Sequence, residues 1–511
     1  MKINKITIKN FRSYKELVTI EVNDLNVFVG KNDIGKSTVL EALDIFFNEG
    51  KGTIKLDKQD INKKALIEGN ENIEISISFS NPPKAVTIDS TNPTNLKDEY
   101  LLNANECLEV KKVYPKAGKE KVFLRAYHPT NSNCSDLITK KNSELKSLLT
   151  DGMNCVDKTK NAEIRKTIRE FYSDDLNLEE IYIELAKEDA KNIWEKLKEH
   201  FPLYTLFQSD RKNSDGDDEV QDPMKLAVKE ILKDPQLCQK LDSVAEEVKA
   251  KLEKVANNTL NKLNEMNPEI SNSLSPIIPS NDSLKWNDVF KNVSFTGDED
   301  ILVNKRGSGV KRLILLNFFR AEAERWKNEG NFPNIIYAVE EPETSQHFNH
   351  QILLMKAFIE ISKSNKSQIF LTTHSSTIVK QLEFNDIKLI KEIDSDKSVI
   401  DVVESNLPYP SLNEINYLAF NEINEEYHNE LYGFIDLEGK LNDFKSDKPT
   451  RQYNKILRNG QIIQVNIIQS EYIRHQIHHP ENNNNLRYTQ EELYNSINDM
   501  RAFISTNIHN V

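Results

Sequence analysis

The amino-acid sequence predicts an α/β fold with a helical, short coiled-coil-like insertion and an all-α C-terminal segment. Strands alternate with helices near the N-terminus and again over residues 299–410, as in an α/β sheet. Between these regions, residues 224–265 carry apolar side chains at a spacing of roughly 3.5, which is typical of a coiled coil. Residues 410–511 are polar and helical in pattern. We therefore expect segments at 1–99, 100–200, 201–298, 299–409 and 410–511.

Length and composition indicate a globular protein. The 511 residues are enough for two to four domains that each bury a core. The apolar class makes up 38% and charged residues 29%, and no apolar run is as long as a membrane span. The N-terminus enters an alternating pattern at once and shows no signal peptide. We expect a cytoplasmic protein without membrane contact.

The cysteine spacing and the net charge argue against several kinds of site and ligand. The cysteines are widely spaced and include no C-x-x-C pair, so neither a zinc site nor a disulfide framework is indicated. They are Cys107, Cys134, Cys155 and Cys238. A formal charge of −13 argues against a protein that coats nucleic acid over its whole surface, although it leaves room for a local basic groove.

The first predicted strands lead into a glycine-bearing loop. Residues 3–9 alternate between apolar and polar side chains, residues 17–22 form a second strand, and residues 25–29 are mainly apolar. After Gly30 the chain enters a predicted helix over 36–47. Later predicted elements are the strands 73–80, 203–207, 335–339 and 369–373 and the helix 348–362.

The glycine-bearing loop predicts a nucleotide site. Gly30–Ser37 reads Gly-Lys-Asn-Asp-Ile-Gly-Lys-Ser and matches G-x-x-x-x-G-K-[ST] in full. Glycines let backbone N–H groups surround phosphate oxygens, and the helix N-terminus adds a positive dipole end. We expect Lys36 to reach the β- and γ-phosphates and the Ser37 hydroxyl to help hold Mg²⁺. The predicted ATP contacts in this loop are Gly30, Asn32, Gly35, Lys36, Ser37 and Thr38.

A carboxylate pair at the end of a second apolar strand completes the expected chemistry. Residues 335–339 are followed by Glu340, Glu341, Pro342 and Glu343. A carboxylate at a strand tip is suited to hold magnesium, and its neighbour can polarise an attacking water. We assign Glu340 to the metal and Glu341 to general-base work, which typically contributes a factor of about 10²–10⁴ in rate. The alternative interpretation is a solvated acidic turn.

Two further motifs are weaker by themselves. His374 ends an apolar strand one helix after the carboxylate pair, where a side chain that senses the γ-phosphate is expected. A lone histidine is more often structural. Ser308 and Gly309 precede an apolar helix, and small residues at a helix N-terminus can bind an anion. Their position before the carboxylate strand favours a nucleotide role for this loop.

The order of these motifs resembles the ABC-like ATPases of the RecF, SMC and OLD group. The resemblance covers about residues 1–90 and 200–410 and includes the opening motif Lys9–Tyr14, in which Arg12 is expected near the phosphates. It implies an ABC-type ATPase head in which the serine of one subunit caps the ATP of the other, and therefore a homodimer or a higher even-numbered oligomer. Three departures are the glutamate at 340, the reduced signature around Ser308, and no Q-loop glutamine near Ser80.

The C-terminal segment offers a second, looser motif. Arg474 and His479 are spaced as in the R-x4-H motif of HEPN ribonucleases, which segment 410–511 resembles as a whole. In that family the arginine stabilises charge on the phosphorane and the histidine moves a proton of the RNA 2′-hydroxyl. A helix end rich in histidine and asparagine, without catalysis, is the alternative. Asp394 and Asp396 form Asp-x-Asp, but without the glutamate context of a Toprim nuclease a solvated turn is favoured.

Residues 206–211 and 220–225 resemble ATPases of bacterial anti-phage systems of the Septu type, which associate with a separate HNH nuclease. The acidic stretch 209–219 between them is interpreted as a solvated loop that could bind a partner. The sequence therefore predicts an ATPase whose nucleotide state gates a nuclease, either a partner or its own C-terminal segment, with DNA or tRNA as the nucleic acid. A repair clamp that binds DNA without an effector is the alternative, and a plain assembly scaffold is a third.

Overall fold

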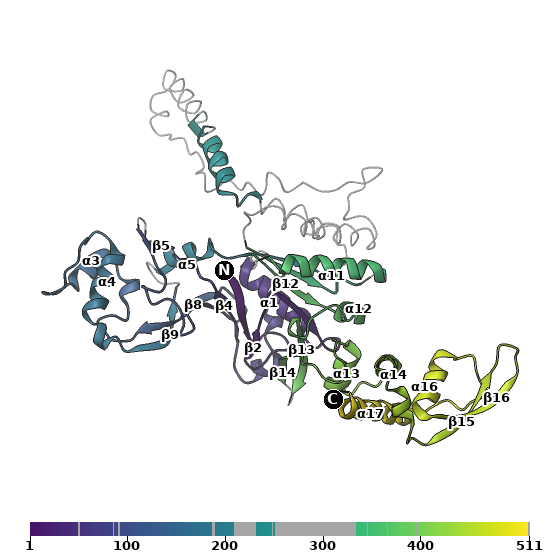
Figure 1. Ribbon diagram of the computed structural model, residues 1–511. Coiled ribbons are helices and arrows are strands. Elements are labelled where there is room, and N and C mark those ends of the chain that lie inside the picture. Colours follow the sequence, from purple (N-terminus) through teal and green to yellow (C-terminus); the bar gives the residue numbers. More distant parts are fainter. Residues whose placement is uncertain are drawn as a thin grey trace.

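The computed structural model describes residues 1–208, 231–250 and 334–508, apart from residues 50, 51, 85, 90, 91, 186–189, 248, 345, 365, 394 and 395. Two six-stranded sheets dominate this part of the chain. In Figure 1 the C-terminal segment, in yellow, lies at the opposite end of the molecule from helices α3 and α4. None of the described helices is long and apolar enough to cross a bilayer.

The first sheet is antiparallel and has the order β2-β1-β4-β7-β8-β9. Its strands are β1 (Lys2–Lys9), β2 (Val18–Glu21), β4 (Asn72–Ser80), β7 (Leu108–Pro115), β8 (Lys121–Pro129) and β9 (Leu178–Glu184). Alternate residues such as Ile6, Ile8, Ile75 and Ile77 are fully buried on one face. This burial confirms the period-two pattern of residues 3–9 and 73–80, because successive strand side chains point to opposite faces.

The second sheet has the order β10-β11-β12-β3-β13-β14 and is parallel from β10 to β13. Its strands are β3 (Leu25–Val29), β10 (Leu203–Phe207), β11 (Ile335–Glu340), β12 (Ser367–Thr372), β13 (Ile387–Ile393) and β14 (Asp396–Asp401), the last antiparallel to β13. Every residue of β3 and β12 is buried. Strands of a parallel sheet are covered on both faces, which explains their continuous apolar runs.

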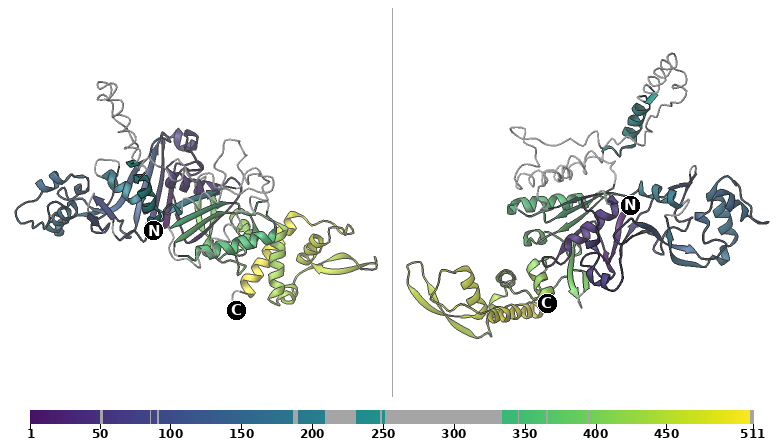
Figure 2. Two further views of the ribbon diagram at one scale, coloured as in Figure 1. Left: turned by 90° about the horizontal axis from the view of Figure 1, so that it is seen from above. Right: turned by 180° about the vertical axis from the view of Figure 1, so that it is seen from behind.

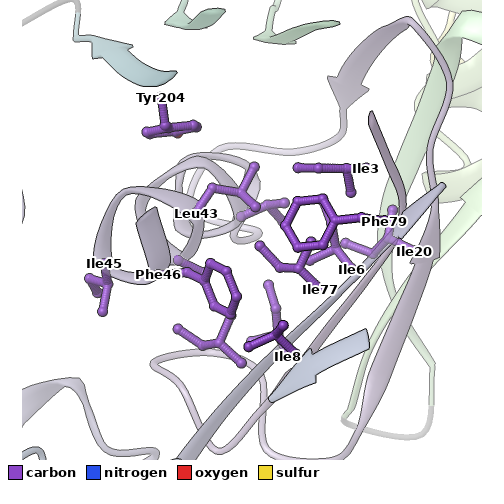
Figure 3. Packing of buried hydrophobic residues seen from close by; sticks show 14 of the residues in the cluster. Ile3, Ile6, Ile8, Ile20, Leu43, Ile45, Phe46, Ile77, Phe79 and Tyr204 are labelled. Atoms are coloured by element: carbon purple, nitrogen blue, oxygen red, sulfur yellow. The ribbon is translucent and has the colours of Figure 1, made fainter. Parts of the chain in front are cut away.

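Helix α1 (Lys36–Asn48) lies between the two sheets. Its residues Leu43 and Phe46 belong to one core with Ile6 and Phe79 of the antiparallel sheet and Phe370 of the parallel sheet. Figure 3 shows this packing, with Tyr204 of β10 on the other side of the helix. The parallel sheet is covered on its second face by α11 (Phe348–Ser362), α12 (Ser376–Val379) and α13 (Leu412–Phe420).

A smaller unit is attached between β8 and β9. It contains α3 (Asn142–Ser147) and α4 (Asn161–Phe171) around a separate core that includes Ile164 and Ile168. At its junction with the sheet, buried Glu99 accepts hydrogen bonds from Arg165 at 2.7 and 2.9 Å and from Arg169 at 2.7 Å. The remaining short elements are α2 (Lys63–Ile67), β5 (Val86–Asp89), β6 (Asn92–Thr94) and α5 (Ala190–Lys198).

The C-terminal segment is not all-α, so that prediction is wrong in one respect. Helices α14 (Glu425–Leu437), α15 (Leu441–Lys445), α16 (Gln469–His478) and α17 (Gln490–Asn507) share a core with the end of α13. Between α15 and α16, however, β15 (Thr450–Ile456) and β16 (Ile462–Ile468) form an antiparallel hairpin. The sequence carries part of a hairpin signature: Asn459-Gly460 forms the turn, residues 463–467 after it alternate between apolar and polar, and Gly460 adopts a φ of 81°.

The predicted coiled-coil-like region lies mostly outside the described residues. Residues 235–247 are helical.

Candidate nucleotide site

The glycine-bearing loop lies at the carboxyl end of β3, at the centre of the parallel sheet. Gly30 has a φ of 149° and Gly35 a φ of 109°. A Cβ atom on Gly30 would lie 2.6 Å from the backbone oxygen of Ile390, and one on Gly35 would lie 2.7 Å from the hydroxyl of Ser13. Glycine is therefore required at both positions for conformation and for space. The loop then enters α1 at Lys36, with the N–H groups of the first helical turn open to the cleft.

Lys36 folds back over its own loop. Its Nζ donates hydrogen bonds to the backbone oxygens of Gly30 at 3.1 Å and Lys31 at 2.8 Å. Burial lowers the pKa of Lys36 to about 8, an effect that Glu341 and Asp33 oppose. A phosphate group placed in the loop would offer this ammonium a charged acceptor in place of two neutral carbonyl groups.

Glu340 ends β11 next to the start of α1. Burial raises the pKa of Glu340, although the side chains of Gln208 and Ser37 donate hydrogen bonds to its carboxylate. Its Oε1 atom is buried and has no hydrogen-bond partner within the described part of the chain. A hydroxyl and a half-satisfied carboxylate are the oxygen donors that Mg²⁺ takes together with substrate phosphates, so these residues fit the predicted metal role. The described residues contain no cluster of three or more His, Cys, Asp or Glu side chains that could hold a metal ion by themselves.

Gln208 was not identified from the sequence. It follows β10, which pairs in parallel with β11 and brings it beside Glu340. The sequence did predict the buried strand 203–207 that precedes Gln208. Only the strand order shows that the end of this strand adjoins the carboxylate pair.

Glu341 and His374 face each other across the ends of β11 and β12. His374 Nε2 lies 3.4 Å from Glu341 Oε1. Glu341 has a φ of 39°, and its backbone N–H donates to the backbone oxygen of Thr372 at 3.0 Å. Burial and the nearby charge of Lys36 lower the pKa of His374. The imidazole is thus favoured in its neutral form, with one nitrogen able to accept or share a proton.

Glu343 fixes the loop that carries His374, a role the sequence did not reveal. Its Oε1 accepts hydrogen bonds from the Thr373 hydroxyl at 2.8 Å and from the backbone N–H of His374 at 2.7 Å. Burial raises the pKa of Glu343.

Arg12 lies at the cleft with both sides of its guanidinium engaged. Its Nε donates to Asp60 Oδ1 at 2.8 Å, and its Nη1 pairs with Glu41 of α1. The predicted phosphate contact therefore requires Arg12 to share or leave these carboxylates.

Most of the predicted nucleotide-site residues line one cleft of about 820 Å³, while Gly30 and Glu340 are not among its lining residues. Its lining residues are Arg12, Ser13, Asn32, Asp33, Gly35, Lys36, Ser37, Thr38, Glu41, Glu341 and His374. These residues come from distant parts of the chain, and the parallel strand order brings them to one edge of the sheet. Ser308 and Gly309 lie outside the described residues, so their predicted role stays a prediction.

The two residues of the predicted ribonuclease pair have different contacts within the described chain, and their catalytic role stays a prediction. The guanidinium of Arg474 covers the ring of Tyr432 at 4.3 Å, and His479 Nδ1 lies 3.1 Å from Glu481 Oε1. Arg474 lies within α16, and His479 is the residue that follows its end. Asp394 is outside the described residues, and Asp396 begins β14.

Fold and site together define a P-loop nucleotide-binding protein. The chain belongs to the AAA ATPase domain family, whose model matches residues 1–379.

Three relatives span most of this chain. GajA, an endonuclease of Bacillus cereus, is 24% identical over 405 residues, which are 78% of this chain and 59% of GajA. An ATP/GTP phosphatase of Helicobacter pylori is 22% identical over 75% of this chain and 87% of its own. The replication and repair protein RecF of Halothermothrix orenii is 23% identical over 76% of this chain and 97% of its own.

The chain spans only part of some relatives: 59% of the length of GajA, and 31% of an uncharacterised Methanocaldococcus jannaschii protein that is 38% identical over 114 residues. Among solved structures, an SMC head bound to the C-terminal winged-helix domain of ScpA aligns with 79% of this chain and 98% of its own at 13% identity and a TM-score of 0.36.

Proposed function

We propose that this protein is a Mg²⁺-dependent ATPase that forms a homodimer around ATP and thereby gates a nuclease in bacterial anti-phage defence. The observation that carries the ATPase part is the meeting of Lys36, Ser37, Glu340, Glu341 and His374 at one sheet edge. Each of these side chains has the chemical character that phosphoryl transfer to water requires.

Each residue has one task in this reaction. The Gly30–Ser37 loop and Lys36 hold the phosphates, and Ser37 and Glu340 hold the metal, which neutralises charge on the phosphate oxygens when bound. Glu341 accepts a proton from the attacking water, and His374 orients that water and the γ-phosphate. Gln208 and Glu343 keep Glu340 and His374 in position through their hydrogen bonds.

Asn32 and Asp33 of the cleft lining are exposed in the single chain, which supports a shared site. We propose that Ser308 and Gly309 of the second subunit close the cleft, so that two ATP molecules are held between two chains. Binding of ATP then becomes a change of assembly state, and such a change can be transmitted to another protein.

The effector is proposed to be a partner nuclease of the HNH type. The endonuclease name of GajA and the Septu-type motifs support a nuclease connection. The separate contacts of Arg474 and His479 favour a partner over a C-terminal HEPN-like ribonuclease. The name of the RecF relative favours the other candidate, a clamp that binds DNA without an effector.

These alternatives are separated by affinity purification of the full chain from its native operon, followed by sedimentation and cleavage assays with and without ATP. The proposal expects ATP-dependent dimers and a co-purified nuclease whose activity depends on nucleotide. Cleavage of tRNA by the purified chain alone, lost in Arg474→Ala, would instead assign the ribonuclease to the C-terminal segment. ATP-dependent dimers that bind DNA ends without any cleavage would support the clamp.

A further inference from the structure

The hairpin β15–β16 has a charge opposite to that of the chain. Residues 448–470 contain no aspartate or glutamate, whereas the whole protein carries a formal charge of −13. The basic residues of this stretch are Lys448, Arg451, Lys455 and Arg458. The hairpin also lies beyond residue 379, where the match to the ATPase family model ends. Neither the family nor the nucleotide site accounts for it.

One face of the hairpin is fixed to the helical core. Tyr453 stacks on His475 of α16 with ring centroids 5.1 Å apart. The guanidinium of Arg451 lies 3.7 Å from the ring centre of Tyr472 and donates to Glu492 at 2.7 Å. These contacts join the ribbon to the helices α16 and α17 of the same core.

The opposite face presents a ladder of amide side chains. In the strand register Gln452 is opposite Asn466 and Asn454 is opposite Gln464, so all four share one face. Gln452, Gln464 and Asn466 are exposed, and Gln452 Nε2 donates to Gln464 Oε1 at 2.7 Å. Asn454 is half-buried, and its Nδ2 donates to the backbone oxygen of Asn484 at 2.7 Å. Toward the tip the same face carries Ile456, 41% exposed, and its partner Ile462, 50% exposed.

Two cations near the outer end of the hairpin are available to a ligand: Lys455, which by strand alternation lies on the same face as Tyr453, and Arg458 in the turn. Lys448 is paired with Asp499 and Arg451 with Glu492, whereas Lys455 and Arg458 are exposed and form no ion pair within the described residues. Both lie in the outer half of the hairpin, which projects away from the rest of the molecule in Figures 1 and 2.

We infer that the hairpin β15–β16 is a recognition ribbon for double-stranded DNA, with its amide face directed into the major groove. The major groove of B-DNA admits a two-stranded ribbon, and asparagine and glutamine side chains form paired hydrogen bonds with adenine edges there. Apolar tips such as Ile456 and Ile462 suit the methyl groups of thymine. Lys455 and Arg458 then contact the flanking phosphates, which supply the sequence-independent part of the affinity.

The test measures binding of the full-length chain to a labelled duplex DNA by fluorescence anisotropy at several salt concentrations. The double variant Lys455→Glu/Arg458→Glu is expected to weaken binding by at least about tenfold and to reduce the slope of log affinity against log salt by about 1.8, the value for two lost phosphate contacts. The variant Gln452→Ala/Gln464→Ala is expected to weaken binding without changing that slope, since amides contact base edges rather than phosphates.

A matched control changes the same charge elsewhere. Lys146 of α3 and Lys158 are exposed and lie in the unit at the other end of the molecule, so Lys146→Glu/Lys158→Glu should bind DNA like the wild type. Thermal unfolding of every variant confirms that the fold is intact.

Wild-type protein that fails to bind duplex DNA, or ribbon and control variants that lose affinity equally, would refute the inference. Equal ribbon-dependent binding to duplex RNA, whose major groove is too narrow for a ribbon, would also refute it. Loss of ATP hydrolysis has no bearing on these outcomes.

Discussion

Nε2 of His374 lies 3.4 Å from Oε1 of Glu341, although the two residues leave different strands of the parallel sheet. Register explains this proximity: Glu340 pairs with Thr372, so Glu341 and His374, one and two residues beyond these partners, leave the sheet close to each other. Between them and Lys36 is the space that the γ-phosphate and its attacking water would occupy in the proposed reaction.

Replacement of Glu341 by glutamine is expected to slow ATP turnover by a factor of about 10²–10⁴, because the amide cannot accept the proton of water. Nucleotide affinity should persist, since Lys36 and the loop are unchanged, and the closed dimer should accumulate. Phosphate release and sedimentation with ATP measure the two effects. Glu404→Gln, which alters an exposed carboxylate, is the control. Wild-type turnover in Glu341→Gln would move the general base to another residue.

Lys36→Ala is expected to abolish ATP binding, and the wild-type protein should show a pH dependence that reports on the same side chain. Burial lowers the pKa of Lys36 to about 8 in the empty site, and bound phosphates will raise it. Below pH 8 the ammonium is charged in both states and the affinity is flat. Above pH 8 the empty site must take up a proton on binding, so the affinity falls as pH rises.

Titration calorimetry in buffers of different ionisation enthalpy measures this proton uptake. The arginine of Lys36→Arg is charged at every pH used. Any nucleotide affinity that this variant retains should therefore not change with pH above 8. Normal ATP affinity in Lys36→Ala would remove the site assignment.

Shared sites predict complementation between two inactive variants. Ser308→Arg should block hydrolysis with an intact loop at Gly30–Ser37, and Lys36→Ala should block it with an intact Ser308. Mixing the two proteins restores about one working site per heterodimer if the serine acts on the partner's ATP, as nucleotide sandwiching requires. Steady-state hydrolysis over a range of mixing ratios reports the recovery. A flat response at all ratios would show that each chain completes its own site.

Glu99→Ala tests the buried ion cluster that joins the α3–α4 unit to the antiparallel sheet. Loss of the carboxylate removes the counter-charge that Glu99 gives to the buried Arg165 and Arg169, and we expect a decrease of about 3–5 kcal/mol in the free energy of unfolding. Chemical denaturation at neutral pH measures this decrease, and Glu170→Ala, an exposed carboxylate on α4, is the control.

The same cluster predicts a loss of stability in acid. Burial raises the pKa of Glu99, but Arg165 and Arg169 outweigh it and hold that pKa below its ordinary value. A group with a lowered folded-state pKa contributes stability above its unfolded pKa, and this contribution disappears as pH falls through the folded value. Stability of the wild type should therefore drop on acidification more steeply than that of Glu99→Ala. Parallel acid unfolding curves would show that Glu99 does not contribute.

The sequence alone determined the nucleotide loop, the carboxylate strand and the histidine, because each is a local pattern: a glycine loop or polar residue at the end of a buried strand. Sequence patterning also predicted strands 3–9 and 73–80 correctly, since one apolar face repeats at every second residue. The hairpin at 450–468 was missed although its Asn459-Gly460 turn is a local signal. Its first strand is mostly polar, so the sequence there shows no apolar period of two that would distinguish a strand from a polar helix.

Only the tertiary structure decided which of these patterns share a site. Strand order placed Gln208 beside Glu340, and it brought the Glu343 carboxylate to the backbone N–H of His374. Packing of the C-terminal helices gave Arg474 and His479 separate partners. Such relationships depend on which strands pair and on which face a helix packs, and these follow from burial summed over the whole core rather than from any one stretch of sequence.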